Sequence, residues 1–157
     1  MRKVICTAAA SWLAWAGVTL AGTFSFDDPK GVNAISLFLD SPLEPIVGWA
    51  SGVEGTVKYD PLVPDAIEGK IHVATKNIAF VNPRMTAKAH TAEWLNADEH
   101  PGVSFTIKDI DNVKEKGDGV VTADLTGVFS LRGVDKKITA PARLSVIENG
   151  APSGARA

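Results

Sequence analysis

The sequence has little of what disulfide-linked, metal-binding and nucleic-acid-binding proteins need. It contains one cysteine, Cys6, among 157 residues, so an internal disulfide and a cysteine-based zinc or redox site are excluded. No run of lysine and arginine is long enough to follow a phosphate backbone, and the formal net charge is −2. Nucleic acid is therefore not expected as a partner. Neither GxxxxGK[ST] nor GxGxxG occurs, which excludes the common nucleotide-binding loops.

Signals for catalysis are also sparse. The three histidines show neither an HExxH motif nor paired metal-ligand spacing, so we expect no metal. No GxSxG elbow is present. The single thiol, that of Cys6, lies in a segment that we expect to be cleaved during export. Glu93, Asp98 and Glu99 could exchange protons, but carboxylates at a helix-to-strand turn more often cap and solubilise it. We expect neither an enzyme nor a cofactor, and a hydrolase acting on a lipid-like substrate is unsupported.

The chain has enough apolar material for one packed domain. Hydrophobic residues make up 45% and charged residues 22% of the sequence, which are ordinary values for a globular protein. Intrinsic disorder, collagen and coiled coil are therefore disfavoured. A length of 157 residues allows one domain and scarcely two.

Residues 1–21 have the composition of a secretory signal peptide. Arg2 and Lys3 give a positive start, Val4 to Leu20 is apolar and alanine-rich, and Thr19-Leu20-Ala21 resembles a cleavage site. The alternative is an uncleaved anchor, since the apolar run approaches the length of a spanning helix. We expect cleavage after Ala21, a periplasmic or secreted product and no stable membrane insertion. The net charge then becomes −4, because two basic groups and no acidic ones are lost.

After residue 22 the hydrophobic pattern has period two, which is typical of strands with one wet face. From Gly119 to Arg132, apolar or small residues at odd positions alternate with mostly polar ones at even positions. Five more segments alternate in the same way: 35–39, 53–59, 67–80, 103–107 and 138–146. With Phe24 and Phe26 this predicts about seven strands. The phase slips near Lys76-Asn77, which predicts a bulge there.

The connections predict antiparallel hairpins and one inserted helix. Glycines between alternating runs, at 117–119 and in Arg132-Gly133, are typical of hairpin turns. Asn82-Pro83 is a good helix start, and apolar residues follow at helical spacing from Met85 to Leu95. A second short turn, Leu43 to Ser51, is predicted to be helical.

Such a sheet must bury one apolar face, either in two packed layers or in a curled barrel. Strands of nine to thirteen residues would be about 30 to 40 Å long, which favours the barrel. Small residues such as Ala123, Gly127 and Gly55 lie among large ones on the inward faces, so the interior could keep an elongated apolar slot. The alternative is a filled core, which alternation alone favours.

Two segments of the sequence resemble the YceI-like family. Thr91 to Phe105, TAEWLNADEHPGVSF, resembles its helix-to-strand signature, and Leu125 to Ile138, LTGVFSLRGVDKKI, resembles its long hairpin. A weaker likeness covers Gly52 to Pro61, a strand ending in Tyr-Asp-Pro. The resemblance implies a lipocalin-like extended antiparallel β-barrel over residues 22–148. It also implies that the barrel binds a polyisoprenoid or a related fatty-acid-derived amphiphile in its pore.

The resemblance also bears on closure of the barrel. Family members usually continue beyond the strand matching 138–146 with a further strand, whereas residues 149–157 have the composition of a truncated, flexible tail. We therefore expect an incompletely closed barrel with unpaired edge strands. Pairing of an edge with a second copy, giving a homodimer, is one consequence to test.

The candidate ligand-binding residues follow from the inward phase of each strand. Burial of hydrocarbon contributes about 0.8 kcal/mol per CH₂, so an apolar lining suffices. The inward candidates are Leu37, Val57, Ile71, Val73, Phe105, Ile107, Leu125, Phe129 and Leu131. Met85, Trp49 and Trp94 are expected near a mouth or lid, because thioether and indole groups suit half-wet openings. For each residue the alternative is an ordinary core contact.

The sequence thus predicts non-catalytic binding of a long-chain apolar or amphiphilic lipid. The protein would act as a carrier, store or sensor in the periplasm. Arg84, Lys88 and His90 could meet a polar headgroup, but we expect them on a solvated helix face. The alternative function is an interaction or stress-related module without a fixed ligand.

Overall fold

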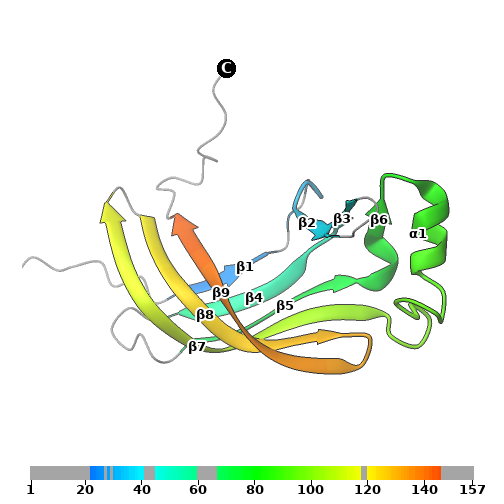
Figure 1. Ribbon diagram of the computed structural model, residues 1–157. Helices are drawn as coiled ribbons and strands as arrows, with labels where there is room; N and C mark the ends of the chain where they lie inside the picture. Colours follow the sequence, from blue (N-terminus) through cyan, green and yellow to red (C-terminus); the bar gives the residue numbers. More distant parts are fainter. Residues whose placement is uncertain are drawn as a thin grey trace, which may run out of the picture.

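The computed structural model describes residues 22–26, 28, 30–40, 45–59, 67–117 and 120–145. The predicted signal peptide and the predicted tail lie outside these residues. The described residues form nine strands, one α-helix and one 3₁₀ turn (Figure 1). The strands are β1 (Gly22–Ser25), β2 (Ala34–Leu39), β3 (Ile46–Ser51), β4 (Glu54–Tyr59), β5 (Glu68–Ala74), β6 (Ile78–Phe80), β7 (Gly102–Gly117), β8 (Val120–Leu131) and β9 (Val134–Ser145). The helix is α1 (Pro83–Ala89), so the predicted all-β fold with one inserted helix is confirmed.

The strands form two antiparallel sheets. The large sheet has the order β1-β4-β5-β7-β8-β9, and the small sheet has the order β2-β3-β6. Figure 1 shows that the large sheet is strongly curved and that the small sheet lies over one end of its concave side, next to α1. Within the described residues β1 and β9 do not pair. The expectation of an incompletely closed barrel is therefore confirmed.

The three longest strands, β7 to β9, follow one another as hairpins. β8 and β9 are joined by Arg132-Gly133, whose φ angles are 50° and 71° and whose flanking residues Leu131 and Val134 pair directly. Two consecutive positive φ angles define the type I′ turn that matches strand twist, so the predicted hairpin is confirmed. The register of β7 against β8 shifts after Ile107, after Asp111 and after Glu115. Such irregularities bend a strand and increase its twist, which accounts for much of the curl.

The helix begins where the sequence predicts and ends earlier. The side-chain oxygen of Asn82 accepts a 2.9 Å hydrogen bond from the Arg84 N–H, and Pro83 occupies the first turn. The helix ends at Ala89, although apolar spacing continues to Leu95. A chain of turns replaces the second half, with the Leu95 N–H donating to the Ala89 carbonyl at 2.9 Å. Leu95 still reaches the core, so the spacing reflects burial without a continuous helix.

The predicted helical turn over Leu43 to Ser51 is wrong, because residues 46–51 form β3, the central strand of the small sheet. Gly48 and Ala50 are buried on one face of β3, and Trp49 is exposed on the other. A Cβ at Gly48 would lie 2.7 Å from the Ala79 carbonyl oxygen. Glycine therefore lets β3 approach β6. This requirement comes from a distant segment of the chain, whereas the neighbouring Pro45 suggests a turn. Residues 41–44 lie outside the described residues.

The predicted bulge near Lys76-Asn77 is instead a 3₁₀ turn over Thr75–Asn77. This turn separates β5 in the large sheet from β6 in the small sheet, so one predicted strand becomes two. Thr75 anchors the turn: its side chain is buried, its hydroxyl donates to the His100 carbonyl at 2.6 Å, and its N–H donates to the Pro101 carbonyl at 2.9 Å. With β3, this division raises the count from about seven strands to nine.

The core has two separate clusters. The first joins the two sheets and consists of Ala50, Val73, Ile78 and Val103, with Leu37, Phe80, Leu95, Phe129 and Leu131 packed around it. The second lies on the large sheet and consists of Ile67, Ile107 and Ile110, with Val57, Phe105, Ala123 and Leu125 around it. No described strand of the small sheet belongs to the second cluster. The described residues therefore cover the inner face of the large sheet less at the second cluster than at the first.

A substitution at Gly127 tests whether β7 and β8 approach each other closely. A Cβ at this buried position would lie 2.8 Å from ring carbons of Phe105 and against the Thr106 carbonyl oxygen. We expect Gly127→Ala to lower the free energy of unfolding by about 1 to 3 kcal/mol, measured by urea denaturation. Gly102→Ala is the control, because the nearest atom, the Val73 carbonyl oxygen, is 3.9 Å away. Equal losses from the two substitutions would contradict this description of the strand pair.

Candidate ligand-binding pocket

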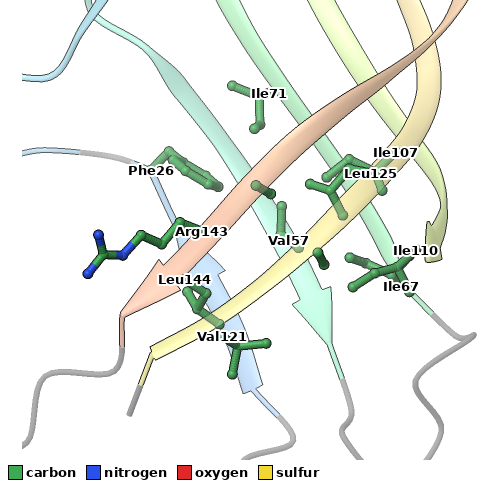
Figure 2. A pocket seen from close by; sticks show the side chains of 12 residues that line it. Phe26, Val57, Ile67, Ile71, Ile107, Ile110, Val121, Leu125, Arg143 and Leu144 are labelled. Carbon is green, nitrogen blue, oxygen red and sulfur yellow. The ribbon is translucent and has the colours of Figure 1, made fainter. Parts of the chain in front are cut away.

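An apolar pocket opens on the inner face of the large sheet, at the second core cluster. Its volume is about 130 Å³. Figure 2 shows side chains from β4, β5, β7, β8 and β9, and from Phe26 after β1, converging on it. The lining residues are Phe26, Val57, Ile67, Ile71, Ile107, Ile110, Val121, Ala123, Leu125, Ala142, Arg143 and Leu144.

Strand alternation places the pocket side chains, and small residues create the space between them. Val121, Ala123 and Leu125 are successive inward positions of β8, which confirms the predicted phase of this strand. Ala123 lies directly opposite Ala142 on β9, so two short side chains face the same volume. The pocket therefore exists where two large residues would otherwise meet across the strands.

Among the described residues, none places a charged group in the interior of the pocket. Arg143 is the one ionisable residue among the lining residues, and Figure 2 shows its guanidinium pointing away from the apolar side chains. A guest would thus be held by burial and dispersion, without a directed hydrogen bond. A cavity of roughly 150 Å³ lined by aliphatic and aromatic residues stays dry and binds benzene. The present volume therefore suits one ring or about five carbon atoms.

The structure brings four of the predicted residues together in this pocket. Val57, Ile71, Ile107 and Leu125 all line it. Phe105 packs beside them against the second core cluster. The five residues share one continuous apolar surface on the inner face of the large sheet.

The other predicted lining residues lie toward the opposite end of the molecule. Val73 belongs to the first core cluster, and Leu37, Phe129 and Leu131 pack around it. Phe129 remains partly exposed and lies directly opposite Phe105. Phe129 therefore links the pocket surface to the first core cluster.

The three residues expected at a mouth or lid do not line the pocket. Met85 is half-buried on α1. Trp94 lies in the turns after α1 and is 47% exposed. Trp49 is equally exposed, on the face of β3 opposite buried Gly48 and Ala50.

Sequence reasoning missed several lining residues, and Ile110 shows why. Ile107 and Ile110 both point inward although they are three positions apart, so strict alternation would place them on opposite faces. The register shift between Ile107 and Asp109 reverses the phase. Ala123 and Ala142 were visible as small inward positions, but only the register shows that they face each other.

The carboxylates considered for acid or base chemistry each have a polar partner. Asp98 lies 2.8 Å from the Lys76 ammonium, whose hydrogen bond and charge lower the pKa of the Asp98 carboxyl. A general acid needs the opposite shift. Glu93 lies 3.7 Å from the Lys88 ammonium. Glu99 Oε2 accepts a 2.7 Å hydrogen bond from the Asn96 side-chain amide. Exposed polar contacts therefore account for all three carboxylates.

Two of the three cationic candidates contact other groups, whereas the ion pairs among the described residues do not include Arg84. Lys88 faces Glu93, and His90 Nε2 lies 2.8 Å from the Ile78 carbonyl oxygen. Within the described ranges, no group of three or more His, Cys, Asp or Glu side chains could hold a metal ion. The helical part of the described chain contains no segment with the length and hydropathy of a membrane span.

Comparisons with known proteins agree on one family. A model of the YceI-like domain matches residues 38–156. A UPF0312 protein of Pectobacterium atrosepticum is 29% identical over 145 residues, covering 91% of this chain and 72% of the relative. Protein YceI of Salmonella newport is 28% identical over 139 residues, covering 86% and 68%. Burkholderia cenocepacia BcnA has a similar fold, with a TM-score of 0.57 at 19% identity over 75% of this chain and 68% of BcnA.

Filling the pocket from within tests its accessibility. Ala123→Phe places a ring in a space of about 130 Å³, whereas Thr126→Phe adds the same ring to the opposite face of β8. We expect benzene to raise the thermal unfolding midpoint of the unmodified protein and of Thr126→Phe, but not of Ala123→Phe. Scanning calorimetry with and without benzene makes the measurement. If benzene raised the unfolding midpoint of Ala123→Phe as much as that of the unmodified protein, benzene would not bind in this pocket.

Proposed function

Because the chain belongs to the YceI-like family, we propose that it binds a long-chain apolar or amphiphilic lipid, such as a polyisoprenoid, without altering it chemically. It acts as a carrier, store or sensor in the periplasm, after export directed by residues 1–21. The observation that carries the proposal is the uncharged pocket on the concave side of the large sheet. Such a surface can select hydrocarbon but has no group arranged to activate a bond.

The size of the pocket determines how such a lipid binds. About 130 Å³ holds the end of a chain, about five carbons, which contributes about 4 kcal/mol at about 0.8 kcal/mol per CH₂. The remaining carbons need further apolar surface. Ile71 lines the pocket, Phe105 lies directly opposite Ile71, and Phe129 lies directly opposite Phe105. This row leads from the pocket toward the first core cluster and gives the rest of the chain its path.

The lack of an interior polar group determines selectivity. A carboxylate, phosphate or hydroxyl would lose its hydration without a partner in the pocket. The headgroup therefore stays outside, and the apolar end enters first. Lipids of equal chain length with different headgroups should bind with similar affinity.

Affinity should depend on chain length. Fatty alcohols from eight to eighteen carbons compete with cis-parinaric acid, whose fluorescence reports binding. We expect each added CH₂ to improve affinity by up to about fourfold, the equivalent of about 0.8 kcal/mol, until the concave surface is covered. Affinity independent of length, or no displacement, would refute binding in an apolar groove.

The row that leads from the pocket can be broken at one residue. Phe129→Lys puts a charge on the inner face of β8, and we expect it to abolish cis-parinaric acid binding. Thr126→Lys is the matched control, because Thr126 faces the other side, where its hydroxyl lies 2.8 Å from the Thr139 hydroxyl. Equal effects from both substitutions would show that the lipid does not lie along β8.

The ligand itself can be recovered from the purified protein. Organic extraction followed by mass spectrometry should release a hydrophobic molecule in stoichiometric amount. Reproducible absence of such a molecule, with no uptake of added prenyl lipids or fatty amides, would favour the interaction or stress-related module.

A further inference from the structure

A second hollow lies on the outer face of the large sheet, behind the apolar pocket. Its volume is about 410 Å³. Its lining comes from the end of β7, the start of β8 and the end of β9, which Figure 1 shows at the end of the large sheet far from α1. Ala123 and Ala142 border both spaces, so the hollow and the pocket lie on opposite sides of one strand pair. The polar residues that line the hollow are Asn112, Lys114, Lys116, Thr122, Asp124 and Arg143.

Three of these residues are cations, and two of them flank a hydroxyl. Thr122 lies directly opposite Lys114 on β7 and directly opposite Arg143 on β9, so the three residues form one row across three strands. Neighbouring strands are about 4.8 Å apart, so the long side chains of Lys114 and Arg143 can both reach a ligand above Thr122. Lys116 lies two positions beyond Lys114 and also lines the hollow.

The positive charges of the hollow are largely unbalanced. The ion pairs of the described chain involve none of the three cations. Asp124 is the one carboxylate among the described lining residues, and its Oδ2 accepts a 2.8 Å hydrogen bond from the Asn112 side-chain amide. Three positive charges thus gather around one negative charge, in a protein whose formal net charge is −2. Like charges placed together repel one another, and a bound anion would relieve this repulsion.

An irregularity in β7 puts a lysine in the row. Asp111 pairs with Asp124, and Lys114 pairs with Thr122, so two residues of β7 fit opposite one residue of β8. This is a β-bulge, and Asn112 within it has a φ of 54°, a backbone conformation in which asparagine is enriched. Without the extra residue, Val113 would lie opposite Thr122. Bulges re-aim side chains and are frequent beside active sites.

We propose that this hollow binds phosphate groups. Ammonium and guanidinium groups are the usual protein partners of phosphate oxygens, and a guanidinium can donate two parallel N–H bonds to them. The row from Lys114 to Arg143 spans about 10 Å, so two linked phosphates can contact both of its ends. A lipid held in the apolar pocket lies on the other side of β8 and β9. The phosphate therefore comes from a soluble phosphorylated compound or from a headgroup at a membrane surface.

Isothermal titration calorimetry with inorganic pyrophosphate tests this proposal on protein purified from the full-length chain. Lys114→Gln and Lys116→Gln should each weaken binding about five- to tenfold, because each removes a charge-assisted contact. Added salt should weaken binding as well. Lys137→Gln is the matched control, because Lys137 lies on the same outer face, opposite Val128, but does not line the hollow. Its affinity should change by less than about twofold.

A substitution at Asp124 should act in the opposite direction. Asp124→Asn keeps an oxygen that can accept the hydrogen bond from Asn112 but removes the one negative charge of the described lining. Pyrophosphate should therefore bind about two- to fivefold more tightly. Circular dichroism melts verify that each variant folds, and damage to the fold would weaken binding instead of strengthening it.

Vesicles separate the two sources of phosphate. For a soluble compound, pyrophosphate binds and the protein does not sediment with vesicles of phosphatidylglycerol and phosphatidylcholine. For a membrane headgroup, the protein sediments with these vesicles, pyrophosphate releases it, and Lys114→Gln weakens the association whereas Lys137→Gln does not. Absence of binding to both probes, an equal loss in Lys137→Gln, or weaker pyrophosphate binding in Asp124→Asn would overturn the proposal.

Discussion

Burial of one concave apolar face is the constraint on which the rest of this structure depends. The large sheet curls but does not close within the described residues, so its inner face needs another cover. The small sheet supplies that cover at one end and forms the first core cluster. At the other end Ile67, Ile107 and Ile110 pack on the large sheet, and the space beside them is the pocket. Among the described residues, the pocket thus lies where the small sheet does not cover the large sheet.

Irregularities in β7 make this arrangement compatible with a single long strand. A regular strand of 16 residues would present every second side chain to the same face. The shift after Ile107 lets Ile110 join the same cluster. It also bends the sheet toward its own concave side. The same local departure therefore supplies both a pocket wall and the curvature that encloses it.

The sequence predicts the structural features that depend on residues close together in the chain. It does not predict the features that depend on contacts between distant segments. Alternation predicts the inner face of β8, and Asn82-Pro83 predicts the start of α1, because both signals are local. β3 is hidden because Gly48 is required by β6 across the sheet, and the break at Thr75 depends on a hydrogen bond to His100. For the candidate site, alternation finds Val57, Ile71, Ile107 and Leu125. It cannot find Ile110, nor the meeting of Ala123 with Ala142, since both depend on register.

Shape distinguishes the two apolar surfaces that remain in contact with solvent. The pocket is concave and lined from five strands, Phe26 and Ile67, so a flexible chain end can be surrounded and lose most of its contact with water. The outer face of the small sheet presents Phe38 and Trp49 on a pleated sheet surface, where a flexible chain would be covered on one side only. Curvature therefore lets the pocket contact a guest on several sides, whereas the outer face of the small sheet offers contact on one side only, although both surfaces are built from the same kinds of residue.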